Sequence, residues 1–336
     1  MHTLSLAPLA LRTERGLAFG SFTGGLPTLD VGASPRGPLL DFFATKRWSY
    51  LAFASDDLFI GCAVVSLSYA STALLFVADR SSQRMLLDES FVGGPLAARF
   101  SDRGHGARAA TFTSRRGRLS VGDSGLEVAL DRGARRVSLA VSAEAGALAP
   151  ALGAVAPVAG GYVNATEKRW AKARAVVDLP DGDAPRRQRR ATGLMGLDHT
   201  RGILARSTAW RWAFALGRAT TGETVVLNLV EGFVGEPECA VWVDGELIPL
   251  GEGRFRYDLA RPLAEWQLGT SCGAVDLRFK PFALHAEQKN LVLVRSHFLQ
   301  PVGGFSGTVR LPSGRGGRTL FLDDVPGVTE HQDVVW

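Results

Sequence analysis

The segment Ala240-Val241-Trp242-Val243-Asp244-Gly245-Glu246-Leu247-Ile248 gives the clearest indication of the fold. Two short apolar runs flank Asp244-Gly245, and this pair favours a β-hairpin because a type I′ turn needs a positive φ at both central residues. Similar runs rich in Val, Leu, Phe and Trp, separated by Gly, Asp, Asn and Ser, recur along the whole chain. The pattern predicts many antiparallel strands joined by turns, and little helix.

The predicted strands fall into two groups of similar length. The chain has 336 residues and 39 glycines, more than the roughly 7 % that globular proteins contain on average, which suits a protein rich in turns. A connector rich in Ala, Pro and Gly occupies residues 143–161. Each side of it is long enough for a barrel of about eight strands, which can enclose one small ligand. We therefore expect an all-β protein of two packed antiparallel β-barrels, with domains at residues 1–155 and 156–336.

The charge pattern does not favour a nucleic-acid partner. Lys and Arg number 38 against 33 Asp and Glu, which gives a formal net charge of +5. The one dense basic cluster consists of Arg186, Arg187, Arg189 and Arg190. No aromatic residues alternate with these arginines, as a base-stacking platform would require. We interpret the cluster as a solvated loop rather than a phosphate-binding arm, and expect no nucleic acid among the partners.

Cysteine usage and the apolar segments indicate the compartment. Cys62, Cys239 and Cys272 are widely spaced, so they indicate neither a zinc site nor a disulfide framework. The N-terminal residues lack the basic region and the sustained apolar run of a signal peptide. The stretch from Ala145 to Gly161 is mostly Ala and Gly and is interrupted by two prolines, so it is too weakly apolar to span a membrane. We expect a cytoplasmic protein with no transmembrane segment, for which peripheral membrane contact stays open.

The common sequence signatures of catalysis are weak or missing. Gly269-Thr270-Ser271-Cys272-Gly273 matches the G-x-S-x-G of α/β-hydrolases, but that motif needs a helix after the serine. Here Ala274 to Phe279 alternates apolar and charged residues, so we expect a hairpin turn instead. The sequence contains no nucleotide-binding glycine motif and no H-E-x-x-H, and its six histidines lack the close spacing common in metal sites. We therefore expect no cofactor and no metal.

One short stretch combines ionisable and aromatic residues, and it supplies the candidate site: Asp198, His199, Arg201, Trp210, Trp212 and Phe214. If Ile203 to Leu216 is a strand, its three aromatic residues lie on one face, because side chains alternate with a period of two. Asp198 and Arg201 lie just upstream, where a barrel strand would begin, so we expect a carboxylate at the edge of an apolar cavity. In the alternative interpretation, these two residues form an ion pair that closes a turn, and the tryptophans simply fill the barrel.

Several motifs give the chain a family resemblance: Pro35-Arg36-Gly37, Lys46-Arg47-Trp48, Asp56-Asp57-Leu58-Phe59-Ile60-Gly61-Cys62-Ala63-Val64-Val65, Asp198-His199-Thr200-Arg201-Gly202, Trp210-Arg211-Trp212-Ala213, Asn228-Leu229, Trp242-Val243-Asp244-Gly245 and Gly327-Val328-Thr329-Glu330-His331. With these motifs the chain resembles the domain-of-unknown-function family 2804 over nearly its whole length. The resemblance implies no established reaction.

A more distant similarity rests on Leu197-Asp198-His199, Gly202 and the pair Trp210-x-Trp212. These residues resemble an Asp-His-x-x-Gly turn before a Trp-rich strand in the carotenoid 1,2-hydratase and lipocalin-like Diels–Alderase group, although Arg201 stands where that group often has Trp. The similarity implies two lipocalin-like, calycin-type barrels around an apolar ligand. It also implies hydration, isomerisation or cyclisation of an unsaturated lipid or terpenoid.

Three functions follow from these observations. The first is binding of an apolar or amphipathic small molecule in a cavity lined by Trp210, Trp212, Phe214 and Arg201. The second is a cofactor-independent hydratase, isomerase or cyclase, in which Asp198 acts as general acid, His199 or Arg201 positions it, and tryptophan faces stabilise positive charge. The third is a structural or interaction protein whose barrels are filled by side chains.

Overall fold

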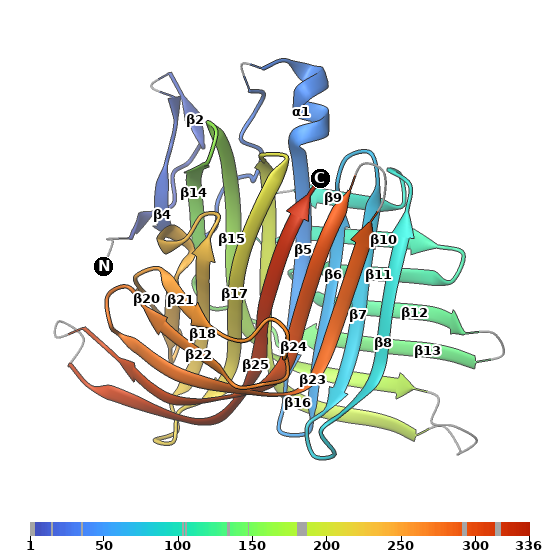
Figure 1. Ribbon diagram of the computed structural model, residues 1–336, viewed down its shortest axis with the longest axis vertical. Helices are drawn as coiled ribbons and strands as arrows, with labels where there is room; N and C mark the ends of the chain where they lie inside the picture. Colours follow the sequence, from blue (N-terminus) through green and yellow to red (C-terminus); the bar gives the residue numbers. More distant parts are fainter. Residues whose placement is uncertain are drawn as a thin grey trace.

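A computed structural model describes residues 4–14, 16–34, 36–102, 104, 106–132, 135–146, 148–179, 187–290, 294–312 and 317–336. Strands make up 68 % of it and helices 3 %, which confirms the all-β prediction. One sheet curls into a nearly closed barrel and the other forms a half-barrel, and the two sheets pack together (Figure 1).

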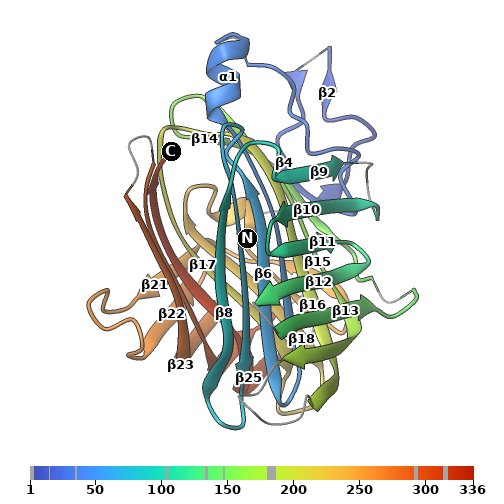
Figure 2. The ribbon, with the colours of Figure 1, turned by 90° about the vertical axis from the view of Figure 1, so that its right-hand side faces the viewer.

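The first sheet has fourteen strands. They are β1 (Ser5–Leu6), β4 (Gly20–Thr23), β5 (Thr45–Ala54), β6 (Leu58–Ser66), β7 (Ser71–Asp79), β8 (Arg84–Gly93), β9 (Ala98–Asp102), β10 (Arg108–Ser114), β11 (Gly117–Gly122), β12 (Gly125–Arg132), β13 (Arg135–Ala143), β14 (Leu152–Val158), β15 (Tyr162–Leu179) and β16 (Arg187–Ile203). The strand order is β8-β7-β6-β5-β16-β15-β13-β12-β11-β10-β9, and β14 joins β15 to β4. Figure 2 shows β9 to β13 running across the direction of β5 to β8, so the sheet folds around its own core.

The second sheet has nine strands in the order β20-β19-β18-β17-β25-β24-β23-β22-β21. They are β17 (Ser207–Arg218), β18 (Thr224–Gly232), β19 (Ala240–Val243), β20 (Glu246–Pro249), β21 (Gly253–Arg256), β22 (Trp266–Thr270), β23 (Val275–Asn290), β24 (Arg295–Arg310) and β25 (Thr319–Val335). The remaining elements are a ribbon of β2 (Arg12–Thr13) with β3 (Gly16–Leu17), the helix α1 (Pro38–Ala44) and the 3₁₀ turn η1 (Glu236–Glu238). In the described part of the chain, no helix is long and apolar enough to cross a membrane.

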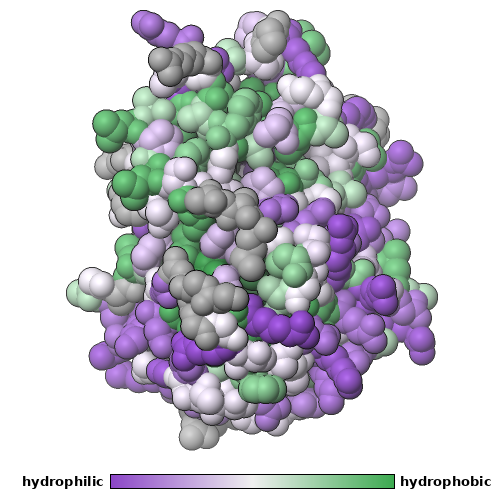
Figure 3. Space-filling view, turned by 90° about the vertical axis from the view of Figure 1, so that its left-hand side faces the viewer, coloured by the Kyte–Doolittle hydropathy of each residue, from purple (hydrophilic) through white to green (hydrophobic). Residues whose placement is uncertain are grey.

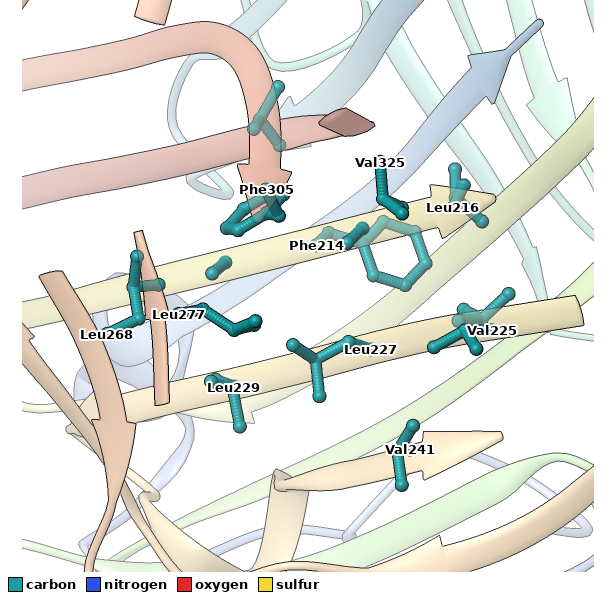
Figure 4. Packing of buried hydrophobic residues seen from close by; sticks show 14 of the residues in the cluster. Phe214, Leu216, Val225, Leu227, Leu229, Val241, Leu268, Leu277, Phe305 and Val325 are labelled. Carbon is teal, nitrogen blue, oxygen red and sulfur yellow. The ribbon is translucent and has the colours of Figure 1, made fainter. Parts of the chain in front are cut away.

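Alternation along the strands separates the two largest of the three apolar cores in the described part of the chain. On β5, Leu51 and Phe53 point into the first barrel, whereas Tyr50 and Ala52 point towards the second sheet. The second core continues through the half-barrel, and Figure 4 shows part of it, with Phe214 on β17 and Leu227 and Leu229 on β18. The two sheets therefore have a shared apolar interface as well as the internal core of the first barrel.

The predicted turns are confirmed at two positions. Asp244 and Gly245 have φ values of 49° and 88° and join β19 to β20, as a type I′ hairpin requires. The G-x-S-x-G match that begins at Gly269 lies at the turn between β22 and β23, with strands on both sides and no helix.

The prediction of a strand from Ile203 to Leu216 is wrong in its first part. Ile203 is the last residue of β16, where it pairs with both Val163 and Thr45, and β17 begins only at Ser207. The chain therefore passes from the first sheet to the second at residues 204–206. Residues 155 and 156, between which we expect the domain boundary, lie in β14, which pairs with β15 and β4 of the first sheet.

Candidate functional site

A cavity of about 150 Å³ lies between the two sheets, and we call it the intersheet cavity. Its walls come from β5, β6, β7, β15 and β16 of the first sheet and from β17, β18, β23, β24 and β25 of the second. Strands from both sheets are therefore needed to form it. Six of its lining residues carry most of the argument below: Trp48, Lys168, Asp198, Trp210, Gln300 and Glu330.

Aromatic rings form one side of this cavity. The rings of Trp48 and Trp210 are stacked with centroids 5.9 Å apart, and Phe233 packs against both. Tyr50 and Trp212 meet edge to face with centroids 5.2 Å apart. Each pair joins β5 to β17 across the two sheets, so these contacts also hold the sheets together.

A buried charged group forms the other side. Lys168 and Asp198 are direct cross-strand partners on β15 and β16, and the ammonium Nζ lies 2.5 Å from the carboxylate Oδ2. The hydroxyls of Thr200 and Thr166 donate to the second oxygen of Asp198, at 2.8 and 3.2 Å. The same ammonium lies 3.1 Å from Oε2 of Glu238 in η1. One buried cation thus pairs with two buried carboxylates.

Electrostatics within this group follow from burial and proximity. Burial alone would lower the pKa of Lys168, but the carboxylates of Asp198 and Glu238 raise it above its ordinary value. Burial raises the pKa of Glu238, and the nearby charge of Asp198 adds to this, whereas Lys168 acts in the opposite direction. Lys168 therefore remains a cation that orients both carboxylates.

Glu330 is a second kind of acid in the same cavity. Its Oε1 accepts a hydrogen bond from the indole N–H of Trp210 at 2.6 Å, and its Oε2 accepts one from the amide of Gln300 at 2.7 Å. The Gln300 oxygen accepts in turn from the hydroxyl of Tyr50 at 3.4 Å. Glu330 makes no ion pair with any residue that the structure describes. Burial raises its pKa to about 7, although its two hydrogen bonds act in the opposite direction and the charge of Asp198 adds to the rise.

The structure brings three of the six predicted site residues to this cavity, namely Asp198, Trp210 and Trp212. Phe214 lies behind them in the core, stacked on Trp212 with ring centroids 5.4 Å apart. His199 and Arg201 lie elsewhere, because they stand one and three positions after Asp198 in β16 and strand side chains alternate between faces.

The partners of these two residues confirm their separation from the cavity. His199 contacts the Ser49 hydroxyl through Nδ1 at 2.8 Å, and its Nε2 lies 3.4 Å from a carboxylate oxygen of Asp123. The guanidinium of Arg201 pairs with Asp30 at 2.6 Å. The alternative Asp198–Arg201 ion pair is therefore not formed, since each residue has another partner.

The sequence analysis did not single out several polar residues of the cavity, among them Lys168, Glu238, Gln300 and Glu330. Glu330 was part of the family motif Gly327 to His331, but nothing in that motif indicates a site. Its position comes from the register of β17 with β25, in which Trp212 is paired with Glu330. Such pairings between distant segments cannot be read from local patterns.

The basic cluster is only partly described. Arg186 and the side chain of Arg187 lie outside the described residues. Arg189 pairs with Asp79 at 2.6 Å, and Arg190 donates to the side chain of Gln188. Among the described residues, no group of three or more His, Cys, Asp and Glu side chains is arranged to hold a metal ion.

Comparisons with known proteins identify a family. The profile described as "Domain of unknown function (DUF2804)" matches residues 33–336. No protein with a curated description matches the sequence. Among solved structures, a provisional AttH from Nitrosomonas europaea is 9 % identical with a TM-score of 0.45, and the match covers 90 % of this chain and 98 % of that one. Kievitone hydratase from Nectria haematococca is 11 % identical with a TM-score of 0.46, and the match covers 95 % and 97 %.

Proposed function

Because the chain belongs to the DUF2804 family, whose description names no activity, we propose a function from its own site: the intersheet cavity binds a small amphipathic molecule. The observation that carries this proposal is the division of the cavity into an aromatic side and a buried polar side. Few, well-placed polar groups in an otherwise apolar cavity are typical of small-molecule sites, because they orient the ligand.

The size of the cavity limits the ligand. A cavity of about 150 Å³ can hold a molecule of roughly the size of benzene. The apolar part of the ligand would lie against Trp48, Trp210 and Trp212, and its polar group would reach Glu330 or Lys168. A cyclic or short-chain alcohol, acid or amine fits this description. The third expected function, a protein with filled barrels, agrees with the packed core of the first barrel but not with this cavity.

Calorimetric titration with benzyl alcohol and with hexan-1-ol tests the proposal, together with mass spectrometry of a solvent extract of the purified protein. We expect saturable binding of at least one alcohol. Val65 lines the cavity and is only partly buried, so Val65→Phe should fill the space and abolish binding. Val92→Phe, at an exposed position on β8, is the matched control. The proposal fails if neither alcohol binds and the extract is empty, or if Val65→Phe binds as the wild type does.

A specific observation also favours proton-transfer catalysis at the same site, namely the position of Glu330. A general acid works best when its pKa is near the working pH, and the pKa of Glu330 is about 7. The sequence analysis assigned this role to Asp198. However, Asp198 accepts hydrogen bonds from Lys168 and two threonines, whereas Glu330 accepts only from neutral donors. In this second function Glu330 donates a proton to the ligand, whereas Asp198 and Lys168 bind the polar group of the ligand.

Deuterium incorporation tests the catalytic proposal. The molecule recovered from the extract is incubated with the protein in D₂O and its mass is followed. We expect Glu330→Gln to slow incorporation by about 10² to 10⁴, as the loss of a general acid does. Asp198→Asn should weaken binding more than turnover. Equal incorporation by the wild type and Glu330→Gln would rule out Glu330 as the acid.

A further inference from the structure

The helix α1 (Pro38–Ala44) exposes the side chains that a helix normally buries. Leu39, Leu40, Phe42 and Phe43 are 70, 57, 46 and 48 % exposed, and no residue of the helix is buried. Single exposed apolar residues are common, but a contiguous group of this kind marks a surface that something else covers.

Polar contacts hold α1 in place without covering its apolar residues. Pro38 occupies the first turn, where its fixed φ suits a helix start. Asp41 accepts hydrogen bonds from the backbone and the hydroxyl of Ser34. At the other end, the Thr45 hydroxyl donates to the Asp41 carbonyl at 2.7 Å, and the Lys46 ammonium donates to the carbonyl of Phe43. The helix is thus fixed by polar contacts, while its apolar side chains stay largely exposed.

Beneath α1 lies a second cavity of about 250 Å³, which we call the entrance cavity. Six of its lining residues are Arg36, Leu40, Phe43, Tyr69, Arg206 and Trp336. Trp336 also lines the intersheet cavity, so one indole side chain lies between the two spaces. In Figure 1, α1 stands above the ends of β5 and β25, both of which contribute to the intersheet cavity. The exposed helix therefore lies close to the part of the intersheet cavity that Trp336 lines.

Cationic groups flank the apolar residues. The Arg36 guanidinium lies 3.8 Å from the ring centroid of Tyr162, and Arg206 donates to the Trp336 carbonyl at 2.6 Å. Both arginines are exposed, and the described lining of the entrance cavity contains no Asp or Glu side chain. In Figure 3, hydrophobic side chains are more frequent on the upper half of the face shown, and hydrophilic ones predominate on its lower half.

We propose that α1 docks on an anionic lipid surface and that the intersheet cavity takes up its amphipathic ligand from that surface. The docking rests on α1 and the two arginines alone, whereas the uptake rests also on the proposed function. Apolar helix residues enter the boundary between headgroups and acyl chains, and nearby arginines bind anionic headgroups. A second copy of this chain is a less suitable partner for α1 than a lipid surface. A two-fold contact through α1 would bring the like-charged arginines of both copies together.

Vesicle flotation tests the docking. The full chain is mixed with vesicles of phosphatidylcholine, alone or with about 30 % phosphatidylglycerol, a lipid that gives the surface its negative potential. We expect binding to the anionic vesicles and weaker binding to the neutral ones. Leu39→Ser with Phe42→Ser should reduce the partition coefficient at least about tenfold, since both side chains lose their burial in lipid. Arg36→Gln with Arg206→Gln should remove most of the preference for anionic vesicles.

The matched control is Phe321→Ser. Phe321 is 55 % exposed near the start of β25, a part of the strand that lies away from α1 in Figure 1, and its substitution should leave vesicle binding unchanged. The proposal is overturned if the wild type binds no vesicles, if the Leu39→Ser and Phe42→Ser variant binds as well as the wild type, or if that variant instead converts a dimer to a monomer in light scattering. Benzyl alcohol binding in solution separates the two proposals. It should persist in the α1 variant, and its absence from every variant would contradict the proposed function while leaving the docking result intact.

Discussion

Asp198 and His199 are neighbours in the sequence, yet their side chains lie on opposite faces of β16. Asp198 contacts Lys168 in the intersheet cavity, whereas His199 contacts Ser49 inside the first barrel. Because strand side chains alternate, adjacent residues cannot serve one site from the middle of a regular strand. The site that the sequence analysis treated as one group is therefore two separate polar groups that share a strand.

Removal of the Lys168 ammonium should destabilise the fold. Lys168→Met leaves Asp198 and Glu238 buried without their cation, a situation that typically costs about 3 to 5 kcal/mol. Urea denaturation measures this as a lower free energy of unfolding. Adding Asp198→Asn and Glu238→Gln to Lys168→Met should recover much of the lost free energy of unfolding. Lys172→Met, at an exposed position on the same strand, is the control, and a loss no larger than that of the control would contradict the prediction.

Glu330 should make the stability depend on pH in a defined window. Its pKa is about 7 in the folded protein against an ordinary value of 4.5, so the unfolded chain releases this proton at lower pH than the folded one. The free energy of unfolding should therefore fall as the pH rises from about 4.5 to about 7, by on the order of 3 kcal/mol from this group. Glu330→Gln should remove this contribution from a series of urea titrations. The same slope in the variant and the wild type would assign the effect to another group.

His285 should make the stability of the fold depend on pH in a different pH range. Burial alone would lower its pKa, but contacts with Asp88 and Glu287 raise the pKa to about 9. A raised histidine pKa stabilises the fold fully below about pH 6.5, and the stabilisation is lost as the pH rises through about 9. Asp88 lies 2.5 Å from the imidazole and is partly exposed, so we expect Asp88→Asn to cost up to about 1 kcal/mol below pH 6.5 and less above pH 9. A cost that does not change with pH would disagree with this expectation.

Gly196 should be intolerant of any side chain. A Cβ atom there would lie 2.2 Å from two ring carbons of Phe214, which belongs to the other sheet and is stacked on Trp212 of its own strand, β17. Gly196→Ala should therefore cost about 1 to 3 kcal/mol, visible as a lower melting temperature. Gly94→Ala is the control, because a Cβ at that position meets no atom within 4 Å. Phe214→Leu added to Gly196→Ala should recover part of the loss, and equal melting temperatures for Gly196→Ala and Gly94→Ala would refute the argument.

Local patterns predicted the parts of the fold that depend on local physics. The Asp244-Gly245 turn requires only backbone conformations of two residues, and the alternation of Trp210 and Trp212 requires only the strand period. The ends of the long strands depend on distant partners, because β16 extends to Ile203 by pairing with Thr45 of β5. The helix α1 was also missed, although Gly37-Pro38 carries a common signal of a helix start.

The same distinction between local patterns and distant pairings applies to the candidate site. Asp198 and the two tryptophans belong to one continuous stretch, and the sequence was sufficient to single them out. Lys168 and Glu330 reach the cavity through pairing with other strands, one on each sheet. Their contribution depends on the register of those pairings, and the sequence contains no local mark of it.

The two faces of β16 also restrict how this protein can change during evolution. A substitution at Asp198 alters the intersheet cavity and leaves the interior of the first barrel intact; these are the two compartments that β16 separates. Insertion or deletion of one residue would exchange the two faces, so that every following side chain would enter the wrong compartment. The chemistry of each compartment can therefore diverge independently by substitution, whereas changes in length are expected to accumulate in the turns and to be excluded from β16.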